Sequence, residues 1–196
     1  MIPNSNSLQR LPTRGNRFSR WVGRVGMTAL GGWTIQGSLP DIPKAIIPVA
    51  PHTSNWDFFV GVFVKLALGL RLSFLGKYSI FVFPVRGILL WLGGIPIRRD
   101  SAHGMVAQMV DEFHRRDQLV LCLAPEGTRS KVTEWRKGFL HIARDAHIPV
   151  VPVSFCFKTR TINISEPMTV TDDIDGALDR IKAFTGKAVG KHPELQ

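Results

Sequence analysis

Short apolar runs rich in β-branched residues alternate with segments of helical periodicity along most of the chain, which restricts the folds open to it. The strand-like runs cover residues 33–36, 44–50, 72–75, 95–98, 118–123, 149–157 and 162–170. Helical patterns cover residues 54–68, 78–92, 138–147 and 174–184, and two more helices begin near Asn16 and Ser101. Because strands that alternate with helices tend to run parallel, we predict a single α/β domain with a mixed, mostly parallel sheet flanked by helices.

Local residue chemistry adds detail to these elements. Pro48 lies inside the run 44–50, although a sheet interior tolerates proline poorly because its nitrogen donates no hydrogen bond. We expect Pro84 to interrupt the helical segment 78–92, and Ser101 to cap the helix that follows it. Residues 162–170 are expected to add edge strands.

The length and the cysteine content fit one intracellular-type domain. A chain of 196 residues can bury about 70% of its unfolded surface. The only two cysteines, Cys122 and Cys156, each lie in an apolar strand-like run, which favours buried free thiols over a disulfide between neighbouring strands. Neither belongs to a C-x-x-C pair, so we expect no metal site.

Positive charge gathers in the first part of the chain. The net charge is +10, and residues 1–40 contain no Asp or Glu but carry Arg10, Arg14, Arg17, Arg20 and Arg24. A helix from Asn16 would place Phe18, Trp21, Val22, Val25 and Ala29 on one face. Such a helix lies either in a membrane interface or against the core with its arginines in water. We assign residues 1–32 as a basic amphipathic membrane-surface segment, 33–186 as the main domain and 187–196 as a C-terminal tail.

No apolar stretch is long enough to predict a membrane span. The longest, residues 58–70, contains Lys65 and falls short of the ~20 residues that a spanning helix needs. A nucleic-acid partner would also suit a basic chain, but the basic residues are not interleaved with aromatic ones and no known nucleic-acid motif occurs. We therefore expect a membrane surface and no nucleic acid.

His52 and Asp57 form the strongest candidate for chemistry. They follow the apolar run 44–50, and ligands of α/β folds bind where strands end. A histidine changes charge between about pH 5 and 8, and a carboxylate on one ring nitrogen fixes its tautomer, so the pair is equipped to deprotonate an alcohol. The alternative is purely structural: Ser54 caps a helix and Asp57 returns the contact from its first turn.

Two further polar segments follow predicted strands or helices. Residues 93–99 combine two glycines with Arg98 and Arg99, whose forked donors suit a phosphate. Residues 125–130 place an acid, a glycine, a hydroxyl and an arginine in one loop, namely Glu126, Gly127, Thr128 and Arg129. Each segment taken alone is also what an ordinary turn or a surface ion pair looks like.

In this order and spacing, the segments resemble the motif blocks of the glycerolipid acyltransferases, the lysophosphatidic acid acyltransferase family. His52 and Asp57 match its H-x4-D block, residues 125–130 match the P-E-G-T-R-S block, and residues 151–153 match a proline-valine block. The second block is altered: Gly93, Ile97 and Arg99 match, whereas Pro96 and Arg98 replace an aromatic residue and an acid. Ala124 and Pro51 also depart from the usual residues. The resemblance covers residues 33–157.

This resemblance implies a glycerol-3-phosphate acyltransferase-type fold and transfer of a fatty acyl group from acyl-CoA or acyl carrier protein. The implied acceptor is the free hydroxyl of a lysophospholipid, foremost 1-acylglycerol-3-phosphate, which would give phosphatidic acid; another lyso-lipid, such as a lyso-aminolipid, is the alternative. The implied catalytic residues are His52 and Asp57, with no cofactor, metal or acyl-enzyme. The implied substrate-binding residues are Arg99, Glu126, Gly127, Thr128 and Arg129.

The same resemblance implies peripheral or monotopic association with the cytoplasmic face of the cell membrane. A hydrolase of the same thioesters and a non-catalytic membrane-binding protein are the rival functions. The acyl length, the donor carrier, the oxyanion stabiliser and the oligomeric state stay open.

Overall fold

A seven-stranded sheet forms the centre of the computed structural model, which describes residues 10–97, 104–128, 131–132 and 134–196. The strands are β1 (Thr34–Gln36), β2 (Lys44–Ala50), β3 (Leu72–Lys77), β4 (Gly94–Ile97), β5 (Leu119–Leu123), β6 (Val153–Cys156) and β7 (Thr161–Ile164). They lie in the order β1-β7-β6-β2-β5-β3-β4, and among these strands only β6 and β7 pair antiparallel. The predicted mixed, mostly parallel sheet is confirmed.

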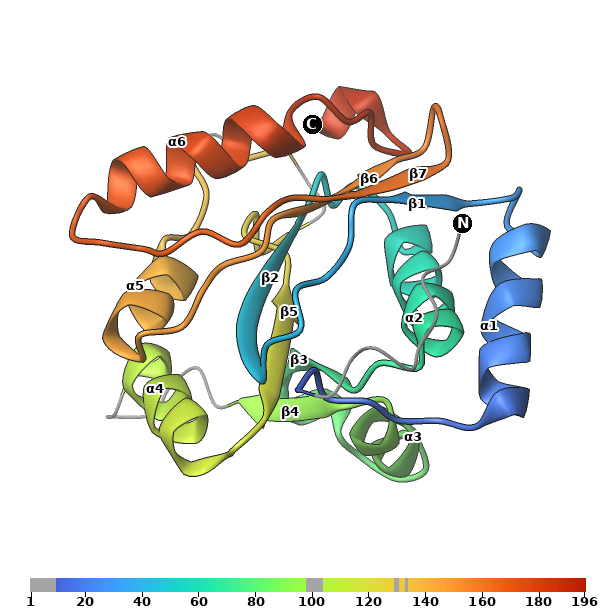
Figure 1. Cartoon of the computed structure of the whole chain (residues 1–196), viewed down its shortest axis with the longest axis horizontal. Coiled ribbons are helices and arrows are strands. Elements are labelled where there is room, and N and C mark those ends of the chain that lie inside the picture. Colours follow the sequence, from blue (N-terminus) through green and yellow to red (C-terminus); the bar gives the residue numbers. More distant parts are fainter. Residues whose placement is uncertain (1–9, 98–103, 129–130, 133) are drawn as a thin grey trace.

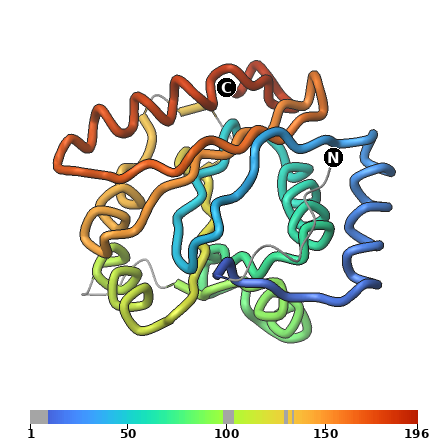
Figure 2. Tube along the Cα trace, in the orientation of Figure 1, coloured from blue at the N-terminus to red at the C-terminus, as the bar shows by residue number. Residues whose placement is uncertain are grey.

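Helices cover both faces of this sheet (Figure 1). They are α1 (Arg17–Ala29), α2 (Trp56–Leu68), α3 (Val85–Trp91), α4 (Met105–Arg115), α5 (Gly138–Asp145) and α6 (Ile174–Thr185), with short 3-10 turns η2 (Tyr78–Ile80) and η3 (Pro193–Leu195). Helices α4, α5 and α6 pack on one face, α2 packs on the other, and α1 lies outside α2, as the chain trace in Figure 2 also shows. Helix α3 packs beside β4.

The continuous apolar runs of the sequence arise because the central strands are buried on both faces. In β2, Ile46 belongs to the core under α4, α5 and α6, whereas its neighbours Ala45 and Ile47 belong to the core under α2. Strand β5 repeats the pattern, with Leu121 on the first side and Val120 on the second. Side chains alternate along a strand, so every residue of such a run must be apolar.

Local signals begin and end the helices. Asn16 and Ser19 form a reciprocal capping box at the start of α1, and the Asp173 side chain accepts the Gly176 N–H at the start of α6 at 2.9 Å. Gly69 ends α2 at φ 66°, a left-handed conformation that favours glycine. Helix α3 begins directly after Pro84, as predicted. The cap predicted at Ser101 lies outside the described residues.

Helix α1 does pack onto the molecule, but through a face that the sequence pattern did not select. Its buried residues are Gly23, Gly26 and Met27. A Cβ at Gly23 would lie 2.2 Å from the backbone nitrogen of Ala67, so the two helices touch at a glycine. The apolar residues Phe18, Trp21 and Val25 remain exposed, at 68%, 58% and 47%.

Strands β6 and β7 differ from expectation because of proline and register. The run 149–157 forms a strand only over β6, since the register that pairs Val49 with Val153 and Ile46 with Val150 places Pro48 opposite Pro152. Pro48 offers no N–H to this ladder, so pairing is interrupted there. The edge-strand prediction for residues 162–170 is wrong: β7 lies between β6 and β1, and β1 takes the edge.

Candidate active site

His52 lies in the loop after the central strand β2, directly before α2. Its Nδ1 lies 2.9 Å from Oδ2 of Asp57 in the first turn of that helix. The imidazole is 20% exposed and the carboxylate 2%, so the ring reaches solvent while its partner is buried. An Nδ1–H that donates to Asp57 leaves Nε2 as the nitrogen available to a substrate proton.

The structural alternative for this segment, in which Ser54 and Asp57 cap the start of a helix, is also observed. Oδ2 of Asp57 accepts the backbone N–H of Ser54 at 3.0 Å, and Oγ of Ser54 accepts the N–H of Trp56 at 3.2 Å. Oδ1 of Asp57 is buried and has no hydrogen-bond partner among the described residues. The carboxylate therefore closes the loop around His52 and orients its ring at the same time.

Glu126 holds the His52 loop from the other side. Its Oε2 accepts the backbone N–H of His52 at 2.8 Å, although the two residues are 74 positions apart. Burial raises the pKa of this carboxyl above its usual range, and the hydrogen bond from His52 opposes that shift. Glu126 thus contacts the backbone of the candidate base.

The rest of the loop after β5 turns sharply at Gly127, whose φ of 69° lies in the left-handed region. A Cβ there would lie 2.8 Å from Nε of Arg136, and the Arg136 N–H donates to the Pro125 carbonyl at 2.9 Å. Arg136 is exposed, and none of the motif blocks includes this cation. It lies beyond residues 125–130 in the sequence and returns to them only in the folded chain. Thr128 is exposed. The predicted residues Arg99 and Arg129 lie outside the described residues.

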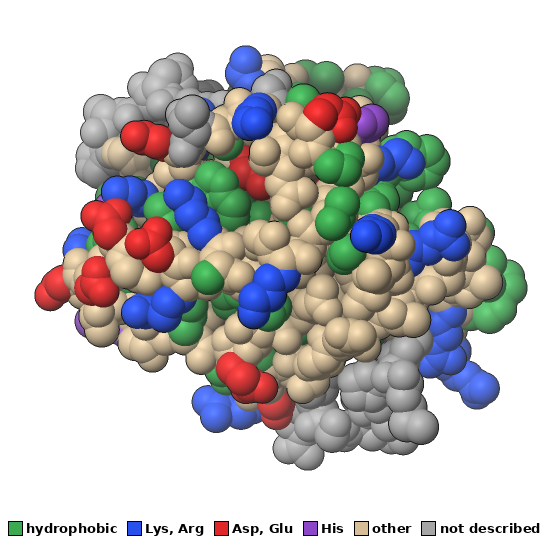
Figure 3. Space-filling view, turned by 90° about the horizontal axis from the view of Figure 1, so that it is seen from above, with side chains coloured by type: hydrophobic (Ala, Val, Ile, Leu, Met, Phe, Trp, Pro, Cys, Tyr) green, Lys and Arg blue, Asp and Glu red, His purple; other side chains and the backbone are tan. Residues whose placement is uncertain are grey.

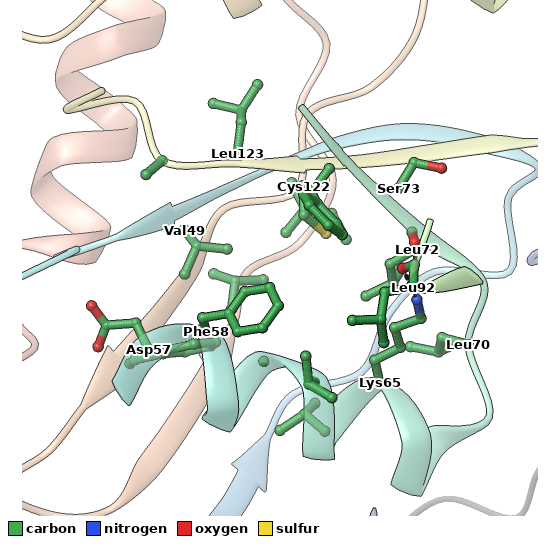
Figure 4. A pocket seen from close by; sticks show the side chains of 18 of the residues that line it. Val49, Asp57, Phe58, Lys65, Leu70, Leu72, Ser73, Leu92, Cys122 and Leu123 are labelled. Carbon is green, nitrogen blue, oxygen red and sulfur yellow. Dashed lines mark hydrogen bonds between the residues drawn. The ribbon is translucent and has the colours of Figure 1, made fainter. Parts of the chain in front are cut away.

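An apolar cavity of about 450 Å³ adjoins this pair. Its walls include His52, Asp57 and Lys65, and Figure 4 shows the space that extends along α2 from Asp57 at one end to Lys65 at the other. Phe58 and Cys122 line it in between. A long apolar cavity that begins at a histidine–carboxylate pair can hold an alkyl chain with its reactive end at the histidine.

Lys65 brings a charged group to the far end of the cavity. Its ammonium donates to the Leu72 carbonyl at 3.3 Å and to the Leu92 carbonyl, and burial lowers its pKa. Burial likewise raises the pKa of the nearby Cys122 thiol to about 12, so that thiol is neutral. Both cysteines are free thiols, as predicted.

Exposed apolar and charged side chains gather in different parts of the surface. Figure 3 shows hydrophobic side chains beside basic ones along the edge that α1 forms, and acidic side chains toward the opposite end. A second exposed apolar group follows η2, where Phe83 is 94% exposed and Val82 and Ile88 are more than half exposed. Among the described helices, none is both long enough and apolar enough to cross a membrane.

Comparison with known proteins gives consistent matches. The acyltransferase family model matches residues 35–156, more than half of the chain. The 1-acyl-sn-glycerol-3-phosphate acyltransferase of Escherichia coli strain K12 is 29% identical over 126 residues, which cover 61% of this chain and 50% of that protein. A chloroplast 1-acyl-sn-glycerol-3-phosphate acyltransferase of Brassica napus is 33% identical over 129 residues, covering 61% of this chain and 36% of that protein. The chain thus spans half or less of the length of these relatives.

A solved structure shares the fold. The crystal structure of the 1-acyl-sn-glycerophosphate acyltransferase from Thermotoga maritima superposes with a TM-score of 0.66 at 21% identity. The match covers 87% of this chain and 76% of that one. At this identity the likeness supports the fold.

Proposed function

The chain belongs to the glycerolipid acyltransferase family, and we propose that it moves a fatty acyl group from a thioester to the free hydroxyl of a lysophospholipid, foremost 1-acylglycerol-3-phosphate. The observation that carries this proposal is the His52–Asp57 pair at one end of the apolar cavity. The named activity of the relatives supports the choice of acceptor.

The pair supplies a general base without a protein nucleophile. Nε2 of His52 takes the proton of the acceptor hydroxyl as its oxygen attacks the thioester carbonyl, and Asp57 stabilises the resulting imidazolium through Nδ1–H. The carbon–sulfur bond then breaks, and the imidazolium returns the proton to the leaving thiolate. Donor and acceptor are both bound during this exchange.

In this proposal, the cavity binds the acyl chain and the neighbouring arginines bind the acceptor. The cavity of about 450 Å³ takes the acyl chain, since its lining is almost wholly apolar. Arg99 and Arg129 bind the acceptor phosphate in this proposal, because a guanidinium matches a phosphate with two parallel hydrogen bonds. The contact of Arg136 with the Gly127 turn supports a basic environment there. Glu126 positions the His52 backbone.

We assign the reaction to a membrane surface, with peripheral attachment to the anionic cytoplasmic face. The exposed Phe18, Trp21 and Val25 on α1, flanked by Arg17 and Arg24, form a face suited to the boundary between headgroups and acyl chains. The exposed residues after η2 add a second apolar contact. An insoluble acceptor would enter from the leaflet on which the enzyme lies.

The test is product analysis with purified protein, lipid vesicles, a panel of lyso-lipids and either acyl-CoA or acyl carrier protein thioester. We expect one diacyl product by mass spectrometry. His52→Ala should lower kcat by about 10²- to 10⁴-fold, the usual contribution of a general base. Asp57→Asn should also lower kcat strongly, because the amide no longer stabilises the imidazolium.

His114→Ala, a change at an exposed histidine of α4, is the matched control and should keep full activity. Circular dichroism melting would show that the inactive variants are folded. Turnover retained in folded His52→Ala would refute the assigned base, and release of free fatty acid alone would identify a hydrolase.

A further inference from the structure

A second cavity, of about 600 Å³, lies beside the first turn of α2. Trp56 and Val60, one helical turn apart, line it, whereas Asp57, Gly61 and Lys65 line the apolar cavity from another side of the same helix. The remaining walls come from the end of α1, the turn between β6 and β7, and the C-terminal tail. The family match ends at residue 156, before that turn and the tail.

Two cations line this second cavity, and none of the described residues that line it is acidic. Arg160 lies in the turn between β6 and β7 at φ 52°, a conformation that costs backbone energy for a residue other than glycine. Its guanidinium donates to the Gly31 carbonyl at 2.8 Å, which holds it at the cavity wall and leaves further N–H groups for a ligand. A Cβ at Gly31 would lie within 2.8 Å of that guanidinium, so the glycine admits the arginine.

Lys191 supplies the second cation from the tail. Its ammonium lies 4.9 Å from the ring centre of Trp56 and 5.8 Å from that of Phe157. Within the described part of the chain it has no hydrogen-bond acceptor and no acidic partner. An anion in the cavity would therefore gain hydrogen bonds from both cations without breaking an existing ion pair.

The aromatic walls restrict the kind of anion. Trp56 is 46% exposed, and Trp33 and Phe157 form the deeper wall in an edge-to-face pair at 4.9 Å. Exposed rings next to basic groups are how proteins hold nucleobases and their phosphates. The volume lies within the range of about 300–1,000 Å³ typical of ligand pockets, larger than a bare phosphate needs.

The tail also ties this cavity to the His52 loop. The His192 N–H donates to Oγ1 of Thr53, the residue after His52, at 3.1 Å. A Cβ at Gly190 would lie 2.7 Å from the same Oγ1, so the tail is pressed against the loop on either side of Lys191. The tail segment that carries Lys191 therefore contacts the residue that follows the candidate base.

We propose that the second cavity binds the phosphorylated nucleotide end of a coenzyme A thioester, with Arg160 and Lys191 on its phosphates and Trp56 against its adenine. This inference rests on the proposed acyl transfer and deepens it, because it selects coenzyme A over a carrier protein as the donor. The pantetheine arm would extend from this cavity to bring the thioester to His52.

Calorimetric titration of the full chain with free coenzyme A, without lipid, tests the proposal. Coenzyme A should bind, dephospho-coenzyme A more weakly, and phosphopantetheine, which lacks the adenine, more weakly still. Arg160→Met and Lys191→Met should each raise the Kd for coenzyme A by about tenfold, the loss expected for one charge-assisted contact. Lys158→Met, an exposed cation in the same turn that does not line the cavity, should leave the Kd unchanged.

Three outcomes would overturn the proposal. The first is that coenzyme A does not bind to the folded wild-type chain. The second is that Arg160→Met and Lys191→Met bind coenzyme A with the same Kd as wild type. The third is a loss of binding to phosphatidylglycerol vesicles in these variants with coenzyme A binding intact, which would make the cavity a lipid-headgroup site. If the protein transferred the acyl group from an acyl carrier protein thioester but did not bind coenzyme A, the proposed function would hold and this inference would be refuted.

Discussion

At the scale of single residues, the contacts of Asp57 show that the catalytic role proposed for it and a structural role need not exclude each other. One carboxylate oxygen carries two lone pairs and accepts from both His52 and Ser54. The loop is therefore closed by the same atom that orients the imidazole. A change at Asp57 should alter the helix start and the ring orientation together.

Glu126 offers a residue-scale prediction that is independent of turnover. Burial raises the pKa of this carboxyl, so the folded protein holds the proton to a higher pH than the unfolded chain does. The contribution of Glu126 to the free energy of unfolding therefore falls as the pH rises from about its unfolded value of 4.5 through the raised pKa. Glu126→Gln keeps an acceptor for the His52 N–H but has no charge to bury.

We expect the Tm of Glu126→Gln, relative to wild type, to increase across this pH window. A change of 1 kcal/mol corresponds to about 2–4 °C in a chain of this size. Thermal melts at a series of pH values would measure the difference, with Glu166→Gln, at an exposed carboxylate, as the control. Parallel pH profiles for Glu126→Gln and wild type would contradict burial of the carboxyl.

At the scale of elements, α1 packs on the molecule through one face and exposes its large apolar side chains on another. Gly23 and Gly26 contact α2, and large side chains stand on the outside. Trp21→Ser should leave stability unchanged and weaken binding to anionic vesicles by about tenfold or more, since burying such a side chain contributes about 1.5–3 kcal/mol. Sedimentation with vesicles and urea unfolding would measure the two effects.

Gly23→Ala tests the other face of α1, which packs against α2. The added methyl group meets the Ala67 backbone, which cannot move aside as a flexible side chain can, so we expect a loss of about 1–3 kcal/mol in the free energy of unfolding. Vesicle binding of the folded protein should persist. If Trp21→Ser bound vesicles as tightly as wild type, α1 would not be the membrane contact.

At the scale of the whole molecule, the apolar cavity exists only because distant segments meet. Strands β2, β3 and β5, helix α2 and residues of α3 and β7 all contribute walls. Lys65 of α2 donates to the Leu72 carbonyl of β3 and to the Leu92 carbonyl after α3, and it lies at the end of the cavity opposite Asp57. If the cavity holds the acyl chain as proposed, the position of that ammonium limits the length of chain that fits.

We expect Lys65→Ala to lengthen the cavity and shift the preference toward longer donors. The ratio of kcat/KM for palmitoyl over lauroyl thioester should rise by about tenfold or more, because a methylene in an apolar pocket is worth about 1–3 kcal/mol. Lys65→Met, which nearly keeps the side-chain length, should retain the original ratio. An unchanged ratio in Lys65→Ala would mean that the chain ends short of this residue.

Much of the architecture followed from local patterns. The apolar runs around Ile46 and Leu121 predicted strands of a mostly parallel sheet, and the helix predicted to begin near Asn16 does begin there. The predictions of a strand over residues 149–157 and of edge strands over residues 162–170 were wrong for a common reason. Strand order and register depend on which distant strand lies alongside, and no window of adjacent residues contains that information.

The alternation of strands and helices, the apolar character of the strands and the His52–Asp57 spacing follow from the order of residues alone, because each depends on side chains a few positions apart. The contact of Glu126 with the His52 backbone, the packing of α1 through its glycines and the approach of Lys65 and Lys191 to the two cavities beside α2 follow from the folded chain. Those contacts join segments far apart in the chain, so they exist only once the core has brought the segments together.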